Sequence, residues 1–210
     1  MQRVELEAPG AIPHFIGSWI MEPRSLCDDL IGFFESHPEL QTRGKTAGGL
    51  SLDSKNSTDL AIRPRELEKE GHQPLRDYLQ ALYRCHQDYL EQWPFLHSVL
   101  PTVDIGSFNL QRYDPGGHFQ LVHSERTTVR TSHRVLAWMT YLNDVKDGGA
   151  THFVHQDIEV QPRKGTTLIW PAEWTHAHAG RVLNSGVKYI ITGWMHFPPA
   201  RTAQPLAGPE

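Results

Sequence analysis

The sequence is poor in cysteine and lacks long apolar runs, and both features narrow the possible functions. It contains 2 cysteines in 210 residues, Cys27 and Cys85. Two cysteines do not make a disulfide framework, so the simplest prediction is a reducing cytoplasm. No apolar run approaches the ~20 residues that a membrane helix needs, and the first residues form no apolar signal region. We therefore expect a cytoplasmic protein with no membrane partner.

The sequence also lacks a basic tract and internal repeats. Its formal net charge is -4 at pH 7, so we expect no nucleic-acid partner. Its length suits a single domain with enough residues to bury a sizeable core. The abundant residue is histidine, with 13 copies. We interpret most of these histidines as scattered surface and core side chains.

The first hundred residues predict a helical layer and a loop. A short strand is expected at 15–20, followed by a helix that opens near Pro23 and ends at Pro38. Apolar residues at helical spacing predict a second helix at 73–92. Between them, residues 41–64 are polar and contain glycine, and we interpret them as a surface loop or as a lid over a site. Residues 1–100 would therefore form a helical buttress and loop.

From residue 103 the pattern changes to short strands separated by turns. Eight regularly spaced strands suggest a β-sandwich or jelly roll, and they are expected at 105–113, 118–123, 134–143, 151–154, 158–161, 166–170, 175–179 and 187–196. The predicted fold is one domain over 1–210, mainly β with flanking helices and with its core at 103–197. The tail at 198–210, rich in proline and alanine, is expected to be disordered.

Within this β-rich part, His123 and Glu125 are separated by one residue. On a strand they would point to the same side and supply two thirds of the facial triad of non-haem Fe(II). A distant histidine should complete it, and 174–180 offers His176 and His178. On a regular strand these two would also face the same side, so direction does not separate them.

The last predicted strand carries Lys188 on the same face as Ile190. If that face is interior, the lysine needs a counter-charge, because burial otherwise drives it to the neutral form. A bound dicarboxylate could supply this charge. Alternatively, Lys188 lies at the strand end and reaches water. The spacing alone leaves both interpretations open.

Six elements occur in a fixed order along this half of the chain. They are QRYDPGG at 111–117, HSE at 123–125, RVLA with YLNDV at 134–145, GGAT at 148–151, PRKG at 162–165, and HAG at 178–180 with Lys188 ten residues after His178. Together they resemble the 2-oxoglutarate- and Fe(II)-dependent dioxygenases of the prolyl 4-hydroxylase-like branch. The resemblance covers roughly residues 105–197.

This resemblance implies a double-stranded β-helix core of the jelly-roll or cupin-like kind. It implies Fe(II) held by His123, Glu125 and His178, since the spacing of ten residues to Lys188 selects His178 over His176. Lys188 would bind the distal carboxylate of 2-oxoglutarate, with Thr151 and Tyr113 as hydrogen-bonding helpers. The implied partners are 2-oxoglutarate and O2, with ascorbate as reductant.

The implied reaction is hydroxylation of a C–H bond of a protein side chain (prolyl-type) or of a small molecule, with release of succinate and CO2. The family usually has aspartate where this chain has Glu125. Glutamate still offers a carboxylate oxygen, and halogenating members lack a carboxylate there, so Glu125 favours hydroxylation. The basic segment that follows it suggests that Arg126 or Arg130 pairs with an acidic substrate, unless the segment is a solvated loop.

Two alternatives fit parts of the pattern. A non-catalytic, cupin-like metal-binding sensor would keep the histidines, and a hydrolytic enzyme with a zinc-activated water would use the same donor types. Neither of them needs Lys188.

Overall fold

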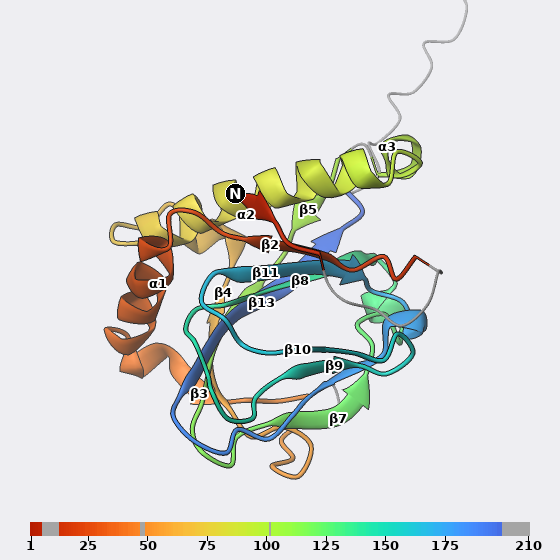
Figure 1. Ribbon diagram of the computed structural model, residues 1–210. Coiled ribbons are helices and arrows are strands. Elements are labelled where there is room, and N and C mark those ends of the chain that lie inside the picture. The colour runs from red at the N-terminus through yellow and green to blue at the C-terminus, as the bar shows by residue number, and fades with distance from the viewer. Residues whose placement is uncertain (6–12, 47–48, 101, 199–210) are drawn as a thin grey trace, which may run out of the picture.

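The computed structural model describes residues 1–5, 13–46, 49–100 and 102–198, which form two facing antiparallel sheets with helices on one outer side (Figure 1). Of the tail at 198–210 that was expected to be disordered, residues 199–210 lie outside the described residues. Among these, nine strands form the larger sheet, with β5 (Asp104–Ile105) paired to β13 beside the main path. That path runs β1 (Gln2–Arg3), β2 (Gly17–Ile20), β11 (Thr166–Pro171), β8 (Arg134–Tyr141), β13 (Lys188–His196), β6 (Phe108–Tyr113), β4 (Thr58–Ile62) and β3 (Gln41–Arg43).

The smaller sheet faces the inner side of the larger one. Its order is β10 (Ile158–Val160), β9 (Thr151–Phe153), β12 (His178–Gly180) and β7 (Phe119–His123). These two sheets, with helices outside, confirm the predicted double-stranded β-helix core with flanking helices. The strands that carry the candidate site residues therefore come from both sheets.

Strand β8 shows how the alternating pattern builds two cores. Its Leu136 and Trp138 pack toward the helices, whereas Ala137, Met139 and Tyr141 pack between the sheets. Successive side chains of a strand point to opposite faces, so a strand buried on both sides reads as a continuous apolar run. The inner core, between the sheets, surrounds the candidate site.

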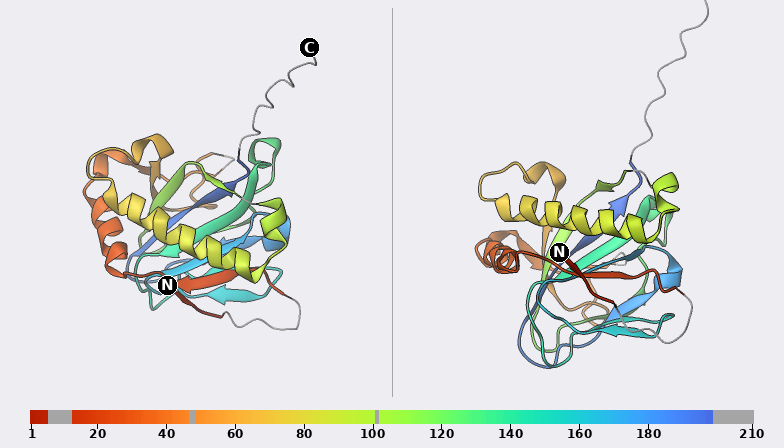
Figure 2. Two further views of the ribbon diagram at one scale, coloured as in Figure 1. Left: turned by 90° about the horizontal axis from the view of Figure 1, so that it is seen from above. Right: turned by 45° about the horizontal axis from the view of Figure 1, so that its top comes forward.

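The helices cover the outer face of the larger sheet. Helix α2 (Gln73–Gln92) has the predicted bounds, and it lies across the strands of this sheet (Figure 2). Its Tyr78 hydroxyl lies 2.9 Å from the Thr140 hydroxyl on β8, inside the core. Helix α1 (Ser25–Glu35) begins two residues after the predicted Pro23, and α3 (Leu96–Val99) is a single turn. No described helix has the length and apolar character to cross a membrane.

The expectation of a loop throughout 41–64 was wrong. Strands β3 and β4 occupy its two ends and extend the larger sheet beyond β6. Leu60 and Ile62 are fully buried toward the helices while Ala61 is exposed, so the alternation is present but only three residues long. Strand β4 is positioned by its antiparallel pairing with β6. Residues 1–100 therefore supply strands as well as the helical layer.

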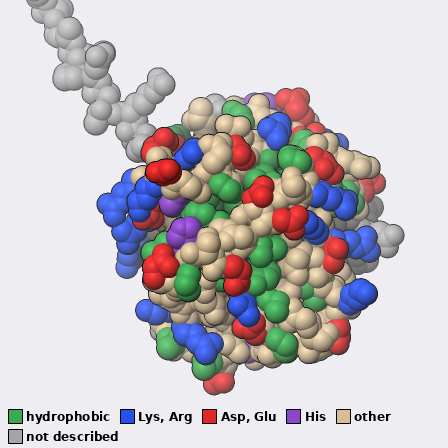
Figure 3. Space-filling view, turned by 90° about the vertical axis from the view of Figure 1, so that its left-hand side faces the viewer, with side chains coloured by type: hydrophobic (Ala, Val, Ile, Leu, Met, Phe, Trp, Pro, Cys, Tyr) green, Lys and Arg blue, Asp and Glu red, His purple; other side chains and the backbone are tan. Residues whose placement is uncertain are grey.

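Short 3-10 turns connect several of these elements, namely η1 (Pro38–Leu40), η2 (Pro64–Glu66), η3 (Val129–Thr131) and η4 (Trp174–His176). The turn η4 replaces the first half of a strand predicted at 175–179. On the side of the molecule shown in Figure 3, acidic and basic side chains are interspersed with hydrophobic ones.

Candidate metal centre and cavity

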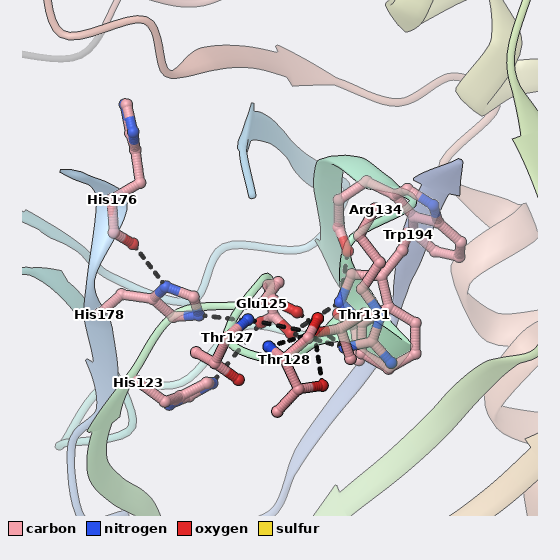
Figure 4. A network of polar contacts seen from close by, with 11 residues as sticks. His123, Glu125, Thr127, Thr128, Thr131, Arg134, His176, His178 and Trp194 are labelled. Atoms are coloured by element: carbon pink, nitrogen blue, oxygen red, sulfur yellow. Dashed lines mark hydrogen bonds and ion pairs between the residues drawn. The ribbon is translucent and has the colours of Figure 1, made fainter. Parts of the chain in front are cut away.

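The fold brings His123, Glu125 and His178 together between the sheets (Figure 4). His123 ends β7, His178 begins β12, and the two residues are direct partners in the antiparallel ladder. The Nε2 atoms of His123 and His178 lie 3.6 and 3.4 Å from Glu125 Oε1, and the three ligand atoms lie within 4.8 Å of one another. Two imidazole nitrogens and a carboxylate oxygen match the donor set of non-haem Fe(II).

Both imidazole rings are oriented by main-chain carbonyls. The Nδ1 atom of His123 lies 2.8 Å from the carbonyl oxygen of Leu121, and that of His178 lies 2.9 Å from the carbonyl oxygen of His176. Each carbonyl accepts the Nδ1 proton, which leaves the Nε2 lone pair free for a metal. Backbone groups thus orient both rings for metal coordination. Substituting the side chain of Leu121 or His176 would not remove these carbonyl groups.

Glu125 lies beyond the end of β7, not on the strand as expected. Its backbone N–H donates to Ala172 O at 3.2 Å, which turns the chain so that its carboxylate still meets the two histidines. Burial would raise the pKa of this carboxyl, but the adjacent imidazoles of His123 and His178, in their protonated form, hold the pKa well below its usual range. Glu125 is therefore available as an anion.

The structure separates His176 from His178 by direction, contrary to the expectation for a regular strand. His176 belongs to the 3-10 turn η4, so it is not in line with β12. Its Nε2 lies 2.9 Å from the carbonyl oxygen of His14, outside the triad. The expectation was wrong because it continued the strand through a segment that turns.

A cavity of about 810 Å³ adjoins the triad and reaches Lys188. The lysine is 3% exposed, its Nζ donates to Gly149 O at 2.8 Å, and it lies 4.3 Å from the centre of the Tyr113 ring. Burial lowers its pKa to about 7. Within the described part of the chain, no carboxylate forms an ion pair with it. Of the two interpretations of Lys188, the structure supports the buried one.

Thr151 and Tyr113, which were expected to be hydrogen-bonding helpers of 2-oxoglutarate, both line this cavity. The Thr151 hydroxyl accepts a hydrogen bond from Tyr141 at 2.6 Å, and the Tyr113 hydroxyl donates to Gln111 Oε1 at 2.7 Å. Tyr141 was not singled out from the sequence. Tyr141 lies two residues after Met139 on β8, so both side chains point to the inner face. This spacing could have been recognised in the sequence.

A buried polar cluster beside the cavity was also missed. The Nζ of Lys55 lies 2.6 Å from Asp59 Oδ2, the Ser57 hydroxyl donates to Asp59 Oδ1 at 2.7 Å, and Gln111 donates to Asp59 at 3.3 Å. Because this cluster tethers the segment between β3 and β4 to β6, the segment forms one wall of the cavity. It was missed because 41–64 was interpreted as a loop.

The structure gives Arg126 a partner within the protein. Its Nη1 lies 2.5 Å from Glu173 Oε1, and neither Arg126 nor Arg130 lines the cavity. The cationic side chains that do line it, besides Lys188, are Arg43, Lys45, Lys55 and Arg134. The positions of Arg126 and Arg130 therefore do not support the hypothesis that either residue binds an acidic substrate.

Comparisons with known proteins agree with this site. Residues 108–196 match the model of the 2OG-Fe(II) oxygenase superfamily, whose description names both Fe(II) and 2-oxoglutarate. The human prolyl 4-hydroxylase subunit alpha-1 is 28% identical over 96 residues, covering 40% of this chain. The chain covers only 18% of that relative's length.

Solved structures share the fold at low identity. A prolyl-4-hydroxylase of Pseudomonas putida superposes with a TM-score of 0.67 at 16% identity, covering 88% of this chain and 94% of its own. A prolyl hydroxylase of Trichoplax adhaerens, in complex with a hypoxia inducible factor peptide fragment, gives 0.67 at 13% identity, covering 88% and 84%. Both structural comparisons concern the fold alone. The segment that matches the family model, residues 108–196, contains the three candidate ligands and Lys188. Residues 108–196 of the chain therefore match the 2OG-Fe(II) oxygenase superfamily, and prolyl 4-hydroxylases are among the similar proteins.

Proposed function

We propose that this protein is a 2-oxoglutarate- and O2-dependent Fe(II) oxygenase that hydroxylates a C–H bond and releases succinate and CO2. One observation carries the proposal: a single cavity contains a His–Glu–His donor set and also a buried lysine that lacks an acidic partner among the described residues. A metal-binding sensor or a zinc hydrolase would use the donor set but has no use for Lys188.

Each site residue then has a physical role. His123, Glu125 and His178 would hold Fe(II), which supplies the redox chemistry with O2 when it is bound. The Lys188 ammonium would bind the distal carboxylate of 2-oxoglutarate, which supplies the counter-charge that a buried cation needs. Thr151, oriented by Tyr141, would add a hydrogen bond, and the Tyr113 ring would form the wall beside the ammonium.

The proposed substrate is a protein side chain of the prolyl type or a small molecule. Curated relatives are named prolyl 4-hydroxylases, and one structural neighbour is in complex with a peptide fragment. The cavity also reaches the surface, because Leu121 lines it and is 46% exposed. We further propose a reducing compartment such as the cytoplasm, because Cys27 and Cys85 are both free and buried.

The direct test is a turnover assay. Protein is mixed anaerobically with Fe(II), ascorbate and 2-oxoglutarate, O2 is admitted, and succinate is measured with and without proline-containing peptides or free amino acids. We expect slow succinate release without substrate and faster release with one substrate class. Metal binding without succinate release would support a sensor, and zinc-dependent hydrolysis would support a hydrolase.

A further inference from the structure

The two oxygens of the Glu125 carboxylate have different surroundings. Oε1 faces the Nε2 atoms of His123 and His178 at 3.6 and 3.4 Å. Oε2 points away from them and accepts a hydrogen bond from the indole Nε1 of Trp194 at 2.7 Å (Figure 4). This short contact involves an ionised acceptor, so it belongs to the stronger class of hydrogen bonds.

This hydrogen bond has a consequence for the coordination of a metal. Glutamate carries one more methylene than aspartate, a difference of about 1.5 Å in reach, and a carboxylate can bind a metal through one oxygen or both. A facial triad holds three positions and leaves the others open for cosubstrate and O2. A glutamate that bound through both oxygens would occupy a fourth position.

The indole is itself held from a second strand. The guanidinium carbon of Arg134, at the start of β8, lies 3.5 Å from the centre of the Trp194 ring on β13. The same arginine donates from Nη1 to the main-chain oxygen of Glu125 at 3.1 Å and lies 3.6 Å from its Oε2. Arg134 therefore contacts the backbone and the carboxylate of Glu125 as well as the indole that bonds to it.

We propose that Trp194, supported by Arg134, is a positioning residue that adapts this site to glutamate. Its N–H holds Oε2 away from the metal, so that Glu125 binds through Oε1 alone and the remaining positions stay open for 2-oxoglutarate and O2. The inference rests on the proposed function, because it requires a metal at the triad. Trp194 would act on the metal through Glu125 and would not itself coordinate it.

The test is a double-mutant cycle on Mn(II) affinity, measured anaerobically by calorimetry without turnover. Trp194→Phe keeps a ring that can stack on Arg134 but removes the N–H donor. We expect it to weaken Mn(II) binding about tenfold, the lower end of what is typical when a partner of a metal ligand is removed. In Glu125→Asp the shorter arm no longer reaches the indole, so Trp194→Phe should add less than about twofold there.

A second readout follows the open positions. The charge-transfer absorption that appears when 2-oxoglutarate joins Fe(II) anaerobically should be weakened or shifted in Trp194→Phe and unaffected by the same change in the Glu125→Asp protein. Arg134→Gln is the second variant, should Trp194→Phe fail to fold. It removes the stacking guanidinium, and it should weaken Mn(II) binding in the protein with its native Glu125 but not in Glu125→Asp.

The matched control is Trp174→Phe, because this indole is 69% exposed on η4 and does not line the cavity. It should leave Mn(II) affinity unchanged. Equal losses from Trp194→Phe in the wild-type and Glu125→Asp backgrounds, or no loss in either, would overturn the inference. His178→Ala separates this failure from that of the proposed function, because wild-type Mn(II) affinity in His178→Ala would mean that the metal is not at the triad.

Discussion

At the scale of single residues, the site combines three side chains oriented for metal binding with one buried cation. This cation, Lys188, has no acidic partner among the described residues. The histidines are oriented by main-chain carbonyls, and Glu125 is held by Trp194. Lys188 instead donates to one carbonyl and otherwise faces an aromatic ring, which compensates only part of the cost of its burial. Its charge is therefore the property of the site that is most sensitive to a bound anion.

Removing that lysine should affect the cosubstrate and spare the metal. A hydrogen bond to a charged group contributes about 1.5–3 kcal/mol, so Lys188→Ala should raise the apparent KM for 2-oxoglutarate about ten- to a hundredfold. Mn(II) affinity without 2-oxoglutarate should change little, because Lys188 is not among the three ligand residues. Steady-state succinate release against 2-oxoglutarate concentration checks this, and an unchanged KM would dismiss Lys188 as a cosubstrate ligand.

The lowered pKa of Lys188 also predicts a pH dependence for 2-oxoglutarate binding. In the unbound protein this pKa is about 7, down from 10.5. Below it the ammonium is already present, whereas above it a proton must be taken up on binding. The affinity should therefore fall as pH rises above about 7, by up to about tenfold per unit.

Calorimetry on Mn(II)-loaded protein tests this pH dependence in two buffers with different ionisation enthalpies. We expect close to one proton taken up per 2-oxoglutarate at about pH 8.5 and almost none at about pH 6. Lys188→Arg keeps its charge over this range and should show no uptake. Equal proton uptake in this variant and in the wild type would assign the pH dependence to another group.

At the scale of elements, regular patterns were predictable and locally held segments were not. The apolar spacing over 73–92 predicted α2 with its observed bounds. The strand β4 was not predicted, because only two apolar residues, Leu60 and Ile62, mark the face that packs toward the helices. Its hydrogen-bonding partner, β6, is also far away in the sequence. The turn η4 was not predicted, because histidine and alanine alternate residue by residue in this segment, a pattern that is also typical of a strand.

The placement of β4 has a measurable consequence for stability. Leu60 is fully buried opposite Leu110, so Leu60→Ala should lower the free energy of unfolding by about 2–5 kcal/mol. Leu52→Ala, in the same polar segment but 51% exposed, should change it by less than about 0.5 kcal/mol. Denaturant unfolding of both variants checks this. Similar small losses of unfolding free energy in the two variants would contradict the burial of β4 and would support a surface loop.

At the scale of the whole molecule, two sheets bring together residues that are far apart in sequence. His123 ends one strand of the smaller sheet and Glu125 follows that strand, His178 lies on the neighbouring strand, and Lys188 belongs to the larger sheet. The sequence could predict which residue types were involved and, through the resemblance, their order. It could not predict the Trp194 and Arg134 contacts or the polar cluster at Asp59, because these depend on pairings between distant strands.

The proposed function depends most on His178, and not His176, completing an iron centre that accepts 2-oxoglutarate. The most direct measurement is an anaerobic titration of Fe(II) with 2-oxoglutarate, following the metal-to-ligand charge-transfer absorption in both alanine variants. His178→Ala should lose the absorption band. His176→Ala should keep it, because that imidazole bonds to the carbonyl of His14 outside the triad. Loss in His176→Ala with retention in His178→Ala would contradict the assignment of the metal centre.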